Sequence, residues 1–280
     1  MHNLFNKITS YFSHLSYQHH SGSVLTGFHG HVSQGKKIIE ELSIITLVLA
    51  VVSVVTVYFP VVANTFINVM IPLLVLFYFR PPGFISLKIG TLVVGKLLLA
   101  LTALSYFSAD WYMIFVVWLL RINIIEAIIK DFKERHIFNA ASGIILLMPT
   151  WLIEAHWLGF YYIISPVSVI WWIFAYTIWN FNFVFLNFPR SISLFHIAVL
   201  ASPLVVVLST LNPGLWLIVR ASTLTESLSF QVYAEKKLKF FQQFRCSQYD
   251  KISNFLKRSL SQTVVISSTI ILSIIFVMAV

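Results

Sequence analysis

Charged residues and cysteine are scarce in this sequence, and each scarcity excludes a class of protein. Asp, Glu, Lys and Arg make up 10% of the 280 residues, whereas 58% are hydrophobic and 16% aromatic. Soluble domains carry about 25% charged residues, so this composition indicates an integral membrane protein. The single cysteine, Cys246, excludes an internal disulfide and a CxxC metal site.

Motifs of catalysis and nucleotide binding are missing as well. The sequence contains no GxSxG, HExxH, Walker loop or dinucleotide fingerprint. Its first forty residues lack the order of a cleavable signal peptide, and the alternation of apolar and polar residues in residues 1–20 predicts a helix on the membrane surface. The histidines between His14 and His31 fit no compact metal motif. We therefore expect no bound metal and no cofactor.

Basic residues outnumber acidic ones by 19 to 10, a formal net charge of +9. We attribute this excess to cytoplasmic loops, which collect Lys and Arg, and expect no nucleic acid partner. Lys or Arg occurs at alternate ends of the apolar runs, and the other ends carry Pro60, Asp110, Glu154 and Pro213. By the positive-inside rule the N-terminus is cytoplasmic.

Apolar runs of about 20 residues predict an all-α, polytopic transmembrane helix bundle of about nine spans with amphipathic surface helices. The spans are expected at residues 41–59, 61–79, 87–107, 111–130, 136–153, 166–187, 193–211, 214–233 and 262–280. The corresponding segments are a cytoplasmic, His-containing amphipathic segment (1–38), an eight-helix bundle (39–235), a basic amphipathic cytoplasmic segment (236–261) and a C-terminal span (262–280). Residues 157–165 are predicted to be an interfacial piece or an extension of the fifth helix, with Trp157, Tyr161 and Tyr162 as headgroup anchors.

The fourth predicted span is unusually polar, because Arg121, Asn123 and Glu126 interrupt an apolar run. A charged residue near the centre of a spanning helix costs about 2.5 to 3.5 kcal/mol on insertion scales, so it normally faces a partner or a water-filled cavity. Asn123 and Glu126 share one stripe of this helix, and Arg121 points to the opposite side. For Arg121 the alternatives are snorkelling or a structural ion pair. Lys96, in the third span, is expected to reach the cytoplasmic interface.

Four stretches resemble, in order and spacing, a family of uncharacterised bacterial multipass membrane proteins. They are INIIEAIIKDF (122–132), FNAASGI (138–144), FAYTIWNFNFVF (174–185) and LIVRASTL (217–224), so the resemblance covers about residues 115–230. The family implies no activity. It does imply that one group of residues belongs together: Glu126, Asp131, Asn139, Trp179, Asn180 and Arg220.

These polar groups define a candidate site for a substrate or ion, with no catalytic residue. Its members in chain order are Arg121, Asn123, Glu126, Asp131, Asn139, Trp179, Asn180, Arg220 and Glu226. We expect Glu126, Asn139, Asn180 and Arg220 to converge between the fourth, fifth, sixth and eighth helices. Single Asn residues in spans can instead be helix-packing contacts.

Three functions remain open for such a site. The first is a transporter or channel of the bacterial inner membrane, with Glu126 as a proton or cation site and Arg220 as its counter-charge or as an anion-binding group. The second is a non-catalytic assembly or sensor subunit, and the third an intramembrane enzyme acting on lipid or isoprenoid. Expected partners are membrane lipids, including the anionic inner leaflet, a small solute or ion, and either further copies of the chain or a partner membrane protein.

Overall fold

The computed structural model describes residues 27–188, 190–237, 254–255 and 258–280. The predicted N-terminal surface helix and most of the basic segment 236–261 lie outside these residues. The fold is all-α, as predicted. The chain forms two compact units, residues 1–39 and 40–280. Described residues of the first unit belong to helix α2 (Gly27–Tyr58), and every site discussed below lies in the second.

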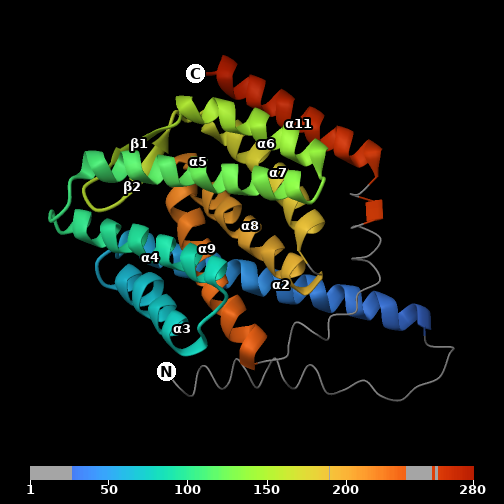
Figure 1. Cartoon of the computed structure of the whole chain (residues 1–280), viewed down its shortest axis with the longest axis horizontal. Coiled ribbons are helices and arrows are strands. Elements are labelled where there is room, and N and C mark those ends of the chain that lie inside the picture. Colours follow the sequence, from blue (N-terminus) through green and yellow to red (C-terminus); the bar gives the residue numbers. More distant parts are fainter. Residues whose placement is uncertain (1–26, 189, 238–253, 256–257) are drawn as a thin grey trace. The chain divides into compact units, whose positions relative to one another are not determined.

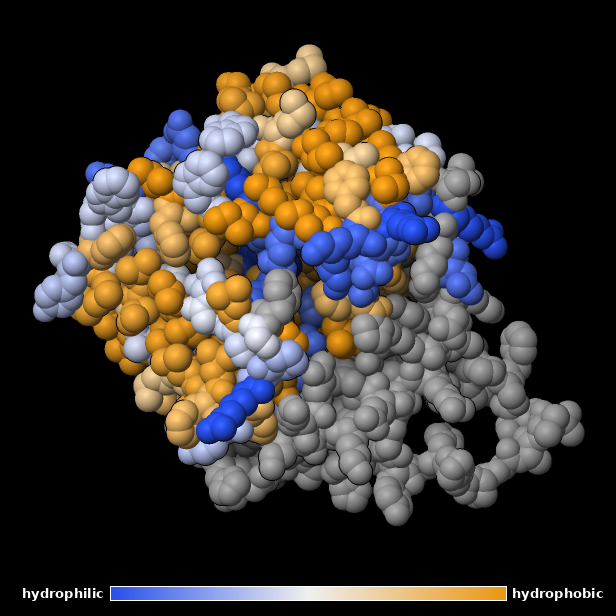
Figure 2. Space-filling view, viewed as in Figure 1, coloured by the Kyte–Doolittle hydropathy of each residue, from blue (hydrophilic) through white to orange (hydrophobic). Residues whose placement is uncertain are grey.

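Four described helices are long and apolar enough to cross a membrane. They are α4 (Gly83–Ala103), α5 (Ala109–Lys133), α7 (Val169–Asn187) and α11 (Ser259–Met278). Large hydrophobic side chains remain exposed along them, such as Ile122 on α5 at 54%. Figure 2 shows hydrophobic residues over much of the coloured surface and hydrophilic residues gathered in patches. Large exposed apolar surfaces are unusual on soluble proteins, so this one fits a membrane environment.

The prediction of about nine spans is not supported, because in the other described helices the apolar segment is no longer than 17 residues or the composition is too polar. Helix α6 (Ile137–Leu147) and the 3-10 turn η3 (Met148–Leu152) together reach about 26 Å, against a hydrocarbon core of about 30 Å. In α9 (Trp216–Lys237), seven of the ten residues from Arg220 to Ser229 are charged or carry a hydroxyl group. The other helical elements are the π-helix η2 (Thr65–Met70), α3 (Ile71–Phe79), α8 (Arg190–Thr210) and the turn η4 (Pro213–Leu215).

A β-hairpin occupies the segment for which an interfacial piece or an extension of the fifth helix was predicted. Strands β1 (Glu154–Trp157) and β2 (Tyr162–Ser165) pair antiparallel, with Trp157 opposite Tyr162. The turn contains Gly159 at a φ of +87°, a conformation that favours glycine. Tyr162 is only 2% exposed, so the prediction of a headgroup anchor is wrong for this residue. Its ring faces inward because alternate side chains of a strand point to opposite faces.

The packing of these helices creates two polar regions. Helix α11 lies along α6 and α7, and α4 contacts both α5 and α9 (Figure 1). Between α7 and α9 the core is aromatic: the ring of Trp216 lies 5.5 Å from Trp172 and 4.8 Å from Tyr176, measured between centroids. All three side chains are buried, so they hold the Tyr176 hydroxyl in a fixed place between the helices.

Candidate functional site

A cavity of about 230 Å³ lies between α4, α5, α7 and α9, with Tyr162 of β2 in its wall. One water molecule needs about 10–15 Å³, so the space is large enough for a small organic ligand. Most of its lining is apolar. Its polar lining residues are Lys88, Thr91, Lys96, Tyr112, Asn123, Glu126, Tyr162, Tyr176 and Arg220.

Glu126 lines this cavity and forms an ion pair with Lys88. The Lys88 ammonium donates to Oε1 of Glu126 at 3.0 Å, and the two side chains are 27% and 35% exposed. Glu126 therefore has a cationic partner on α4, and that partner is not Arg220. A partly exposed pair of this kind contributes little to stability, about 0–1 kcal/mol.

Arg220 lines the same cavity with far fewer partners. The residue is 6% exposed, and within the described part of the chain its guanidinium makes one hydrogen bond, from Nη1 to the carbonyl of Val199 at 3.5 Å. Its Nε is buried without an acceptor. No carboxylate oxygen of the described residues lies within 4.0 Å of it. Since a guanidinium has five N–H donors, most of its bonding capacity is unused.

Lys96 also lines the cavity, and its ammonium is buried instead of reaching the membrane interface. The residue is 3% exposed and donates to the hydroxyl of Ser222 and to the carbonyl of Ile218. Glu226 lies one turn after Ser222 on α9 and accepts a hydrogen bond from Ser53 of α2 at 3.4 Å. The interpretation of Lys96 as an interfacial residue is therefore wrong. Its charge has Glu226 nearby.

Three tyrosines complete the polar lining. The rings of Tyr112 and Tyr162 meet edge to face with centroids 5.7 Å apart, and neither hydroxyl forms a hydrogen bond to a described residue. Burial raises the pKa of the Tyr162 hydroxyl, which keeps it a proton donor at neutral pH. Tyr176 accepts hydrogen bonds from Asn180 at 2.9 Å and from Asn123 at 3.4 Å. Asn180 thus reaches the cavity through Tyr176.

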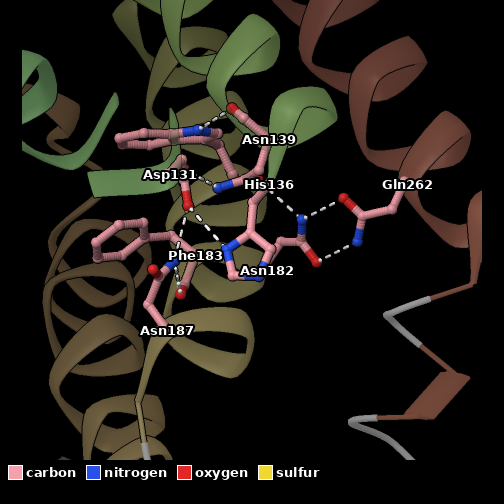
Figure 3. A network of polar contacts seen from close by, with 8 residues as sticks. Asp131, His136, Asn139, Asn182, Phe183, Asn187 and Gln262 are labelled. Carbon is pink, nitrogen blue, oxygen red and sulfur yellow. Dashed lines mark hydrogen bonds and ion pairs between the residues drawn. The ribbon is translucent and has the colours of Figure 1, made fainter. Parts of the chain in front are cut away.

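A second polar region joins α5, α6, α7 and α11 (Figure 3). Asp131 is fully buried, and its two carboxylate oxygens accept hydrogen bonds from Asn139 at 2.6 Å and Asn187 at 2.7 Å. His136 lies 3.6 Å from the same carboxylate. This carboxylate is therefore surrounded by donors, which is what stabilises a buried charge.

The amides continue this network to the last helix. Asn182 donates to Asn139 at 2.8 Å and exchanges two hydrogen bonds with Gln262 of α11, at 3.1 and 3.2 Å. The indole of Trp179 donates to the backbone carbonyl of Asn139 at 3.0 Å. We call the set Asp131, His136, Asn139, Trp179, Asn182, Asn187 and Gln262 the amide network. None of its members lines the cavity.

Arg121 belongs to neither region. Its guanidinium lies 3.9 Å from the ring centroid of Trp151 and 5.0 Å from that of Trp118, and donates to the carbonyl of Thr150 at 3.0 Å. Stacking on two indole rings stabilises a cation without a carboxylate. This arrangement gives Arg121 a structural role in joining α5 to η3.

The predicted site residues are thus divided among several regions. Glu126, Asn123 and Arg220 line the cavity, with Asn180 next to it, whereas Asp131, Asn139 and Trp179 belong to the amide network. Glu226 lies beside Lys96, and Arg121 is separate. Within the described part of the chain, no cluster of His, Cys, Asp or Glu could hold a metal ion.

Sequence reasoning missed several residues of both regions. Lys96 meets the intramembrane-charge criterion that identified Glu126, so that signal was present. Gln262 was the polar residue at the start of the last predicted span. Tyr112 and Tyr162 gave no signal, because tyrosines near span ends are ordinarily interfacial anchors.

Comparison with known families gives one match. Residues 136–280 match a family described as a family of unknown function, DUF5692. The chain belongs to this family. The predicted resemblance to an uncharacterised family is confirmed, although the match begins at residue 136 and continues to residue 280 instead of covering residues 115–230. Curated proteins and solved structures give no match.

The DUF5692 match covers the two polar regions to different extents. Six of the seven members of the amide network lie inside the match, and the seventh, Asp131, precedes it by five residues. The cavity is split: Tyr162, Tyr176 and Arg220 lie inside the match, whereas the α4 and α5 walls with Lys88 and Glu126 precede it.

Proposed function

We propose that this protein is a membrane transporter or channel whose solute site is the cavity between Glu126 and Arg220. Arg220 carries the proposal. A guanidinium that is 6% exposed and makes one long hydrogen bond is costly to bury, unless a ligand completes its bonding. Residues that break the rules of stable packing in this way are expected at functional sites.

The position of the cavity supports a path across the membrane. Three of its four wall helices, α4, α5 and α7, are candidate spans. Its lining follows α5 from Tyr112 to Glu126, which lie about 21 Å apart along the helix, out of a hydrocarbon core of about 30 Å. A cavity of this length needs only a short opening at either end to connect two aqueous phases.

The polar groups take different roles along this path. Arg220 would hold the solute. The pair of Lys88 and Glu126, about one-third exposed, would form a gate at one end, because a weak and partly solvated ion pair can open at little energetic cost.

We place the protein in the bacterial inner membrane, as a multipass protein with a cytoplasmic N-terminus. This orientation rests on the two ends of the candidate span α5: the basic turn Lys133–Arg135 follows it, whereas the segment before it, around Asp110, lacks Lys and Arg. Cysteine substitutions in a Cys246→Ser background test it. A membrane-impermeant thiol reagent applied outside should label Asp110→Cys and spare Lys133→Cys, and the reverse pattern would contradict the orientation.

Transport can be tested without knowing the solute. Purified protein in liposomes is adsorbed on a solid-supported membrane, and charge movement is recorded after concentration jumps of sodium chloride, sodium acetate and sodium octanoate. We expect at least one of these anions to evoke a transient current that empty liposomes lack. Arg220→Gln should abolish the current. The matched control is Arg121→Gln, the same substitution at a buried arginine outside the cavity, which should keep it.

A current that is absent with all three salts, or equal in Arg220→Gln and the unmodified protein, would reject the proposal. Folding of each variant is checked by its elution profile and melting temperature. The assembly or sensor alternative predicts no current at all and normal folding of both variants.

One contact favours the intramembrane enzyme as a second candidate. Lys96 hydrogen-bonds the hydroxyl of Ser222, and a serine beside a lysine can act as nucleophile and base. However, Ser222 is not among the cavity-lining residues and also accepts a hydrogen bond from Thr56 at 3.2 Å. Ser222→Ala should therefore leave the evoked current intact. Loss of the current in that variant would include the pair in the transport path, whereas the enzyme alternative predicts that neither the unmodified protein nor Ser222→Ala carries a current.

A further inference from the structure

The charges around the cavity do not balance, and this imbalance points to the sign of the ligand. Three cations, Lys88, Lys96 and Arg220, line the cavity with one carboxylate, Glu126. Lys88 is paired with Glu126, and Lys96 has Glu226 nearby on α9. Arg220 alone lacks a carboxylate among the described residues. One positive charge therefore remains for a ligand, which favours a single anionic group.

The guanidinium of Arg220 favours particular kinds of anionic group. The planar fork of N–H donors matches the two oxygens of a carboxylate or a phosphate ester, and such charge-assisted pairs are stronger than neutral hydrogen bonds. The hydroxyls of Tyr112 and Tyr162 form no hydrogen bond to a described residue, so these two donors are also available to a ligand.

Most of the remaining lining is apolar and disfavours a fully hydrated ion. Side chains from three helices form these walls: Leu92, Val116, Leu119, Leu120, Leu217 and Leu224. A multiply charged inorganic ion would lose its hydration shell here without enough donors to replace it. An apolar chain or ring gains from the same walls, at about 25 cal/mol for each Å² of its surface removed from water.

We infer that the cavity binds an organic monoanion with an apolar body, whose carboxylate or phosphate-type head contacts Arg220 and whose body lies among the leucines of α4, α5 and α9. This inference rests on the proposed function, because it names the solute class of that same site. Length agrees with it, since the lining extends about 21 Å along α5.

Binding is measured by equilibrium dialysis of radiolabelled probes against the full chain in lipid nanodiscs, with empty nanodiscs as blank. Octanoate carries both features of the ligand. Acetate keeps the charge and lacks the body, 1-octanol keeps the body and lacks the charge, and octylammonium reverses the charge. Methyl octyl phosphate, a diester with a single negative charge, tests the second type of head. We expect octanoate or methyl octyl phosphate to bind saturably and more tightly than the other three probes.

Two variants test separately how the head and the body of the ligand contribute to binding. Arg220→Gln should weaken octanoate binding by about 10- to 100-fold, as expected for the loss of a charged hydrogen-bonding partner. Gly95→Leu adds bulk to the cavity wall without changing a charge, since a Cβ at Gly95 would meet only ordinary contacts at 3.5 and 3.6 Å. It should weaken octanoate more than acetate. Arg121→Gln is the control and should bind octanoate normally.

Several outcomes would overturn the inference. Acetate binding as tightly as octanoate would show that the site does not require an apolar body. Binding of 1-octanol or octylammonium as tightly as octanoate would show that it does not require an anionic head. If Arg220→Gln does not fold, the selectivity of the unmodified protein and the effect of Gly95→Leu decide the question. Saturable octanoate binding without an evoked current would support the binding site and reject transport. A current from chloride alone, without octanoate binding, would support transport and reject the organic anion.

Discussion

The amide network and the cavity both contain a buried charge among apolar helices, and the two charges differ in how many hydrogen bonds the protein provides for them. Asp131 is surrounded by two amide donors and His136, and the hydrogen bonds continue through Asn182 to Gln262 (Figure 3). To the described residues, Arg220 makes one hydrogen bond, of 3.5 Å. The first charge is satisfied by the protein itself, whereas the second is left with unused donors facing a cavity.

This difference separates structural charge from charge available to a ligand. Within the described residues, the amide network leaves Nδ1 of His136 and Oδ1 of Asn187 without a hydrogen bond, but it satisfies the buried carboxylate of Asp131. Such a network joins helices and resists change, because each partner that is removed leaves another one unpaired. An underbonded charge contributes nothing to folding and persists where function requires it. The number of hydrogen bonds that a buried polar residue leaves unmade is therefore a stronger marker of function than its position in a span.

The largest effect is expected in the amide network. Asp131→Asn keeps the size of the side chain but replaces one acceptor oxygen with an NH₂ group that faces the amide donor of Asn139 or Asn187. Each buried polar group left without a partner costs about 1–3 kcal/mol. We expect the free energy of unfolding, measured by denaturant titration in detergent, to fall by about 3 kcal/mol or more.

Evoked current normalised to folded protein should change much less in this variant, because Asp131 does not line the cavity. Asn182→Leu should also destabilise the protein, since it breaks the contact with Gln262 of α11. Unchanged stability of both variants would show that the network does not hold these helices together.

A matched pair of glycines gives the next contrast. A Cβ at Gly143 would lie 2.6 Å from Cγ1 of Ile128 and 3.0 Å from Cζ2 of Trp179, so Gly143→Ala overpacks the contact between α5, α6 and α7. It should lower the free energy of unfolding by about 1–3 kcal/mol. Gly95→Ala, in the cavity wall, should instead raise it by up to about 1 kcal/mol, because alanine favours a helix more than glycine does. Equal melting temperatures for the two variants would contradict this difference in packing.

Much of the fold could be predicted from hydrophobic runs alone. The positions of α4, α5, α7 and α11 follow from runs long enough to span a bilayer. Run length failed for residues 136–153, since an apolar run does not show that its helix ends after eleven residues and continues as a 3-10 turn. It also failed for the hairpin, where strand pairing depends on a partner strand and on the turn at Gly159.

For the candidate site, the sequence could predict individual residues but not the contacts between them. Intramembrane charge identified Glu126 and Arg220, and the family resemblance added Asp131; Asp131 and Arg220 are buried, and the Glu126 side chain is about one-third exposed. Their partners could not be read from spacing, because Lys88 and Asn187 come from helices whose rotation and depth depend on tertiary packing. Helical periodicity assigned Glu126 to one face of α5, and only the packing of α4 against that face brings Lys88 to it.

Arg220 should show the opposite sign of effect from Asp131. Arg220→Met replaces an underbonded charge with an apolar side chain of similar length, and buried charges replaced by apolar groups often leave stability unchanged or raise it by about 1–4 kcal/mol. We expect a melting temperature equal to or above that of the unmodified protein, measured in detergent without added anion. Saturating octanoate should raise the melting temperature of the unmodified protein and leave that of Arg220→Met unchanged. A melting temperature lowered as far as that of Asp131→Asn would place Arg220 among the structural charges.

The smallest effect on stability is expected at the ion pair at the end of the cavity. Glu126→Gln makes the same acid-to-amide change as Asp131→Asn, but its partner is Lys88 and both side chains are about one-third exposed. Water compensates for most of what is lost, so the free energy of unfolding should change by less than about 1 kcal/mol. A double-mutant cycle with Lys88→Gln should give a coupling energy of similar size. The evoked current should respond more strongly than stability does, because Glu126 is the carboxylate that lines the cavity and its removal leaves Lys88, Lys96 and Arg220 to attract anions. Glu126→Gln should therefore increase the current carried by an anion, and a large loss of stability with an unaltered current would assign Glu126 to the framework of the fold.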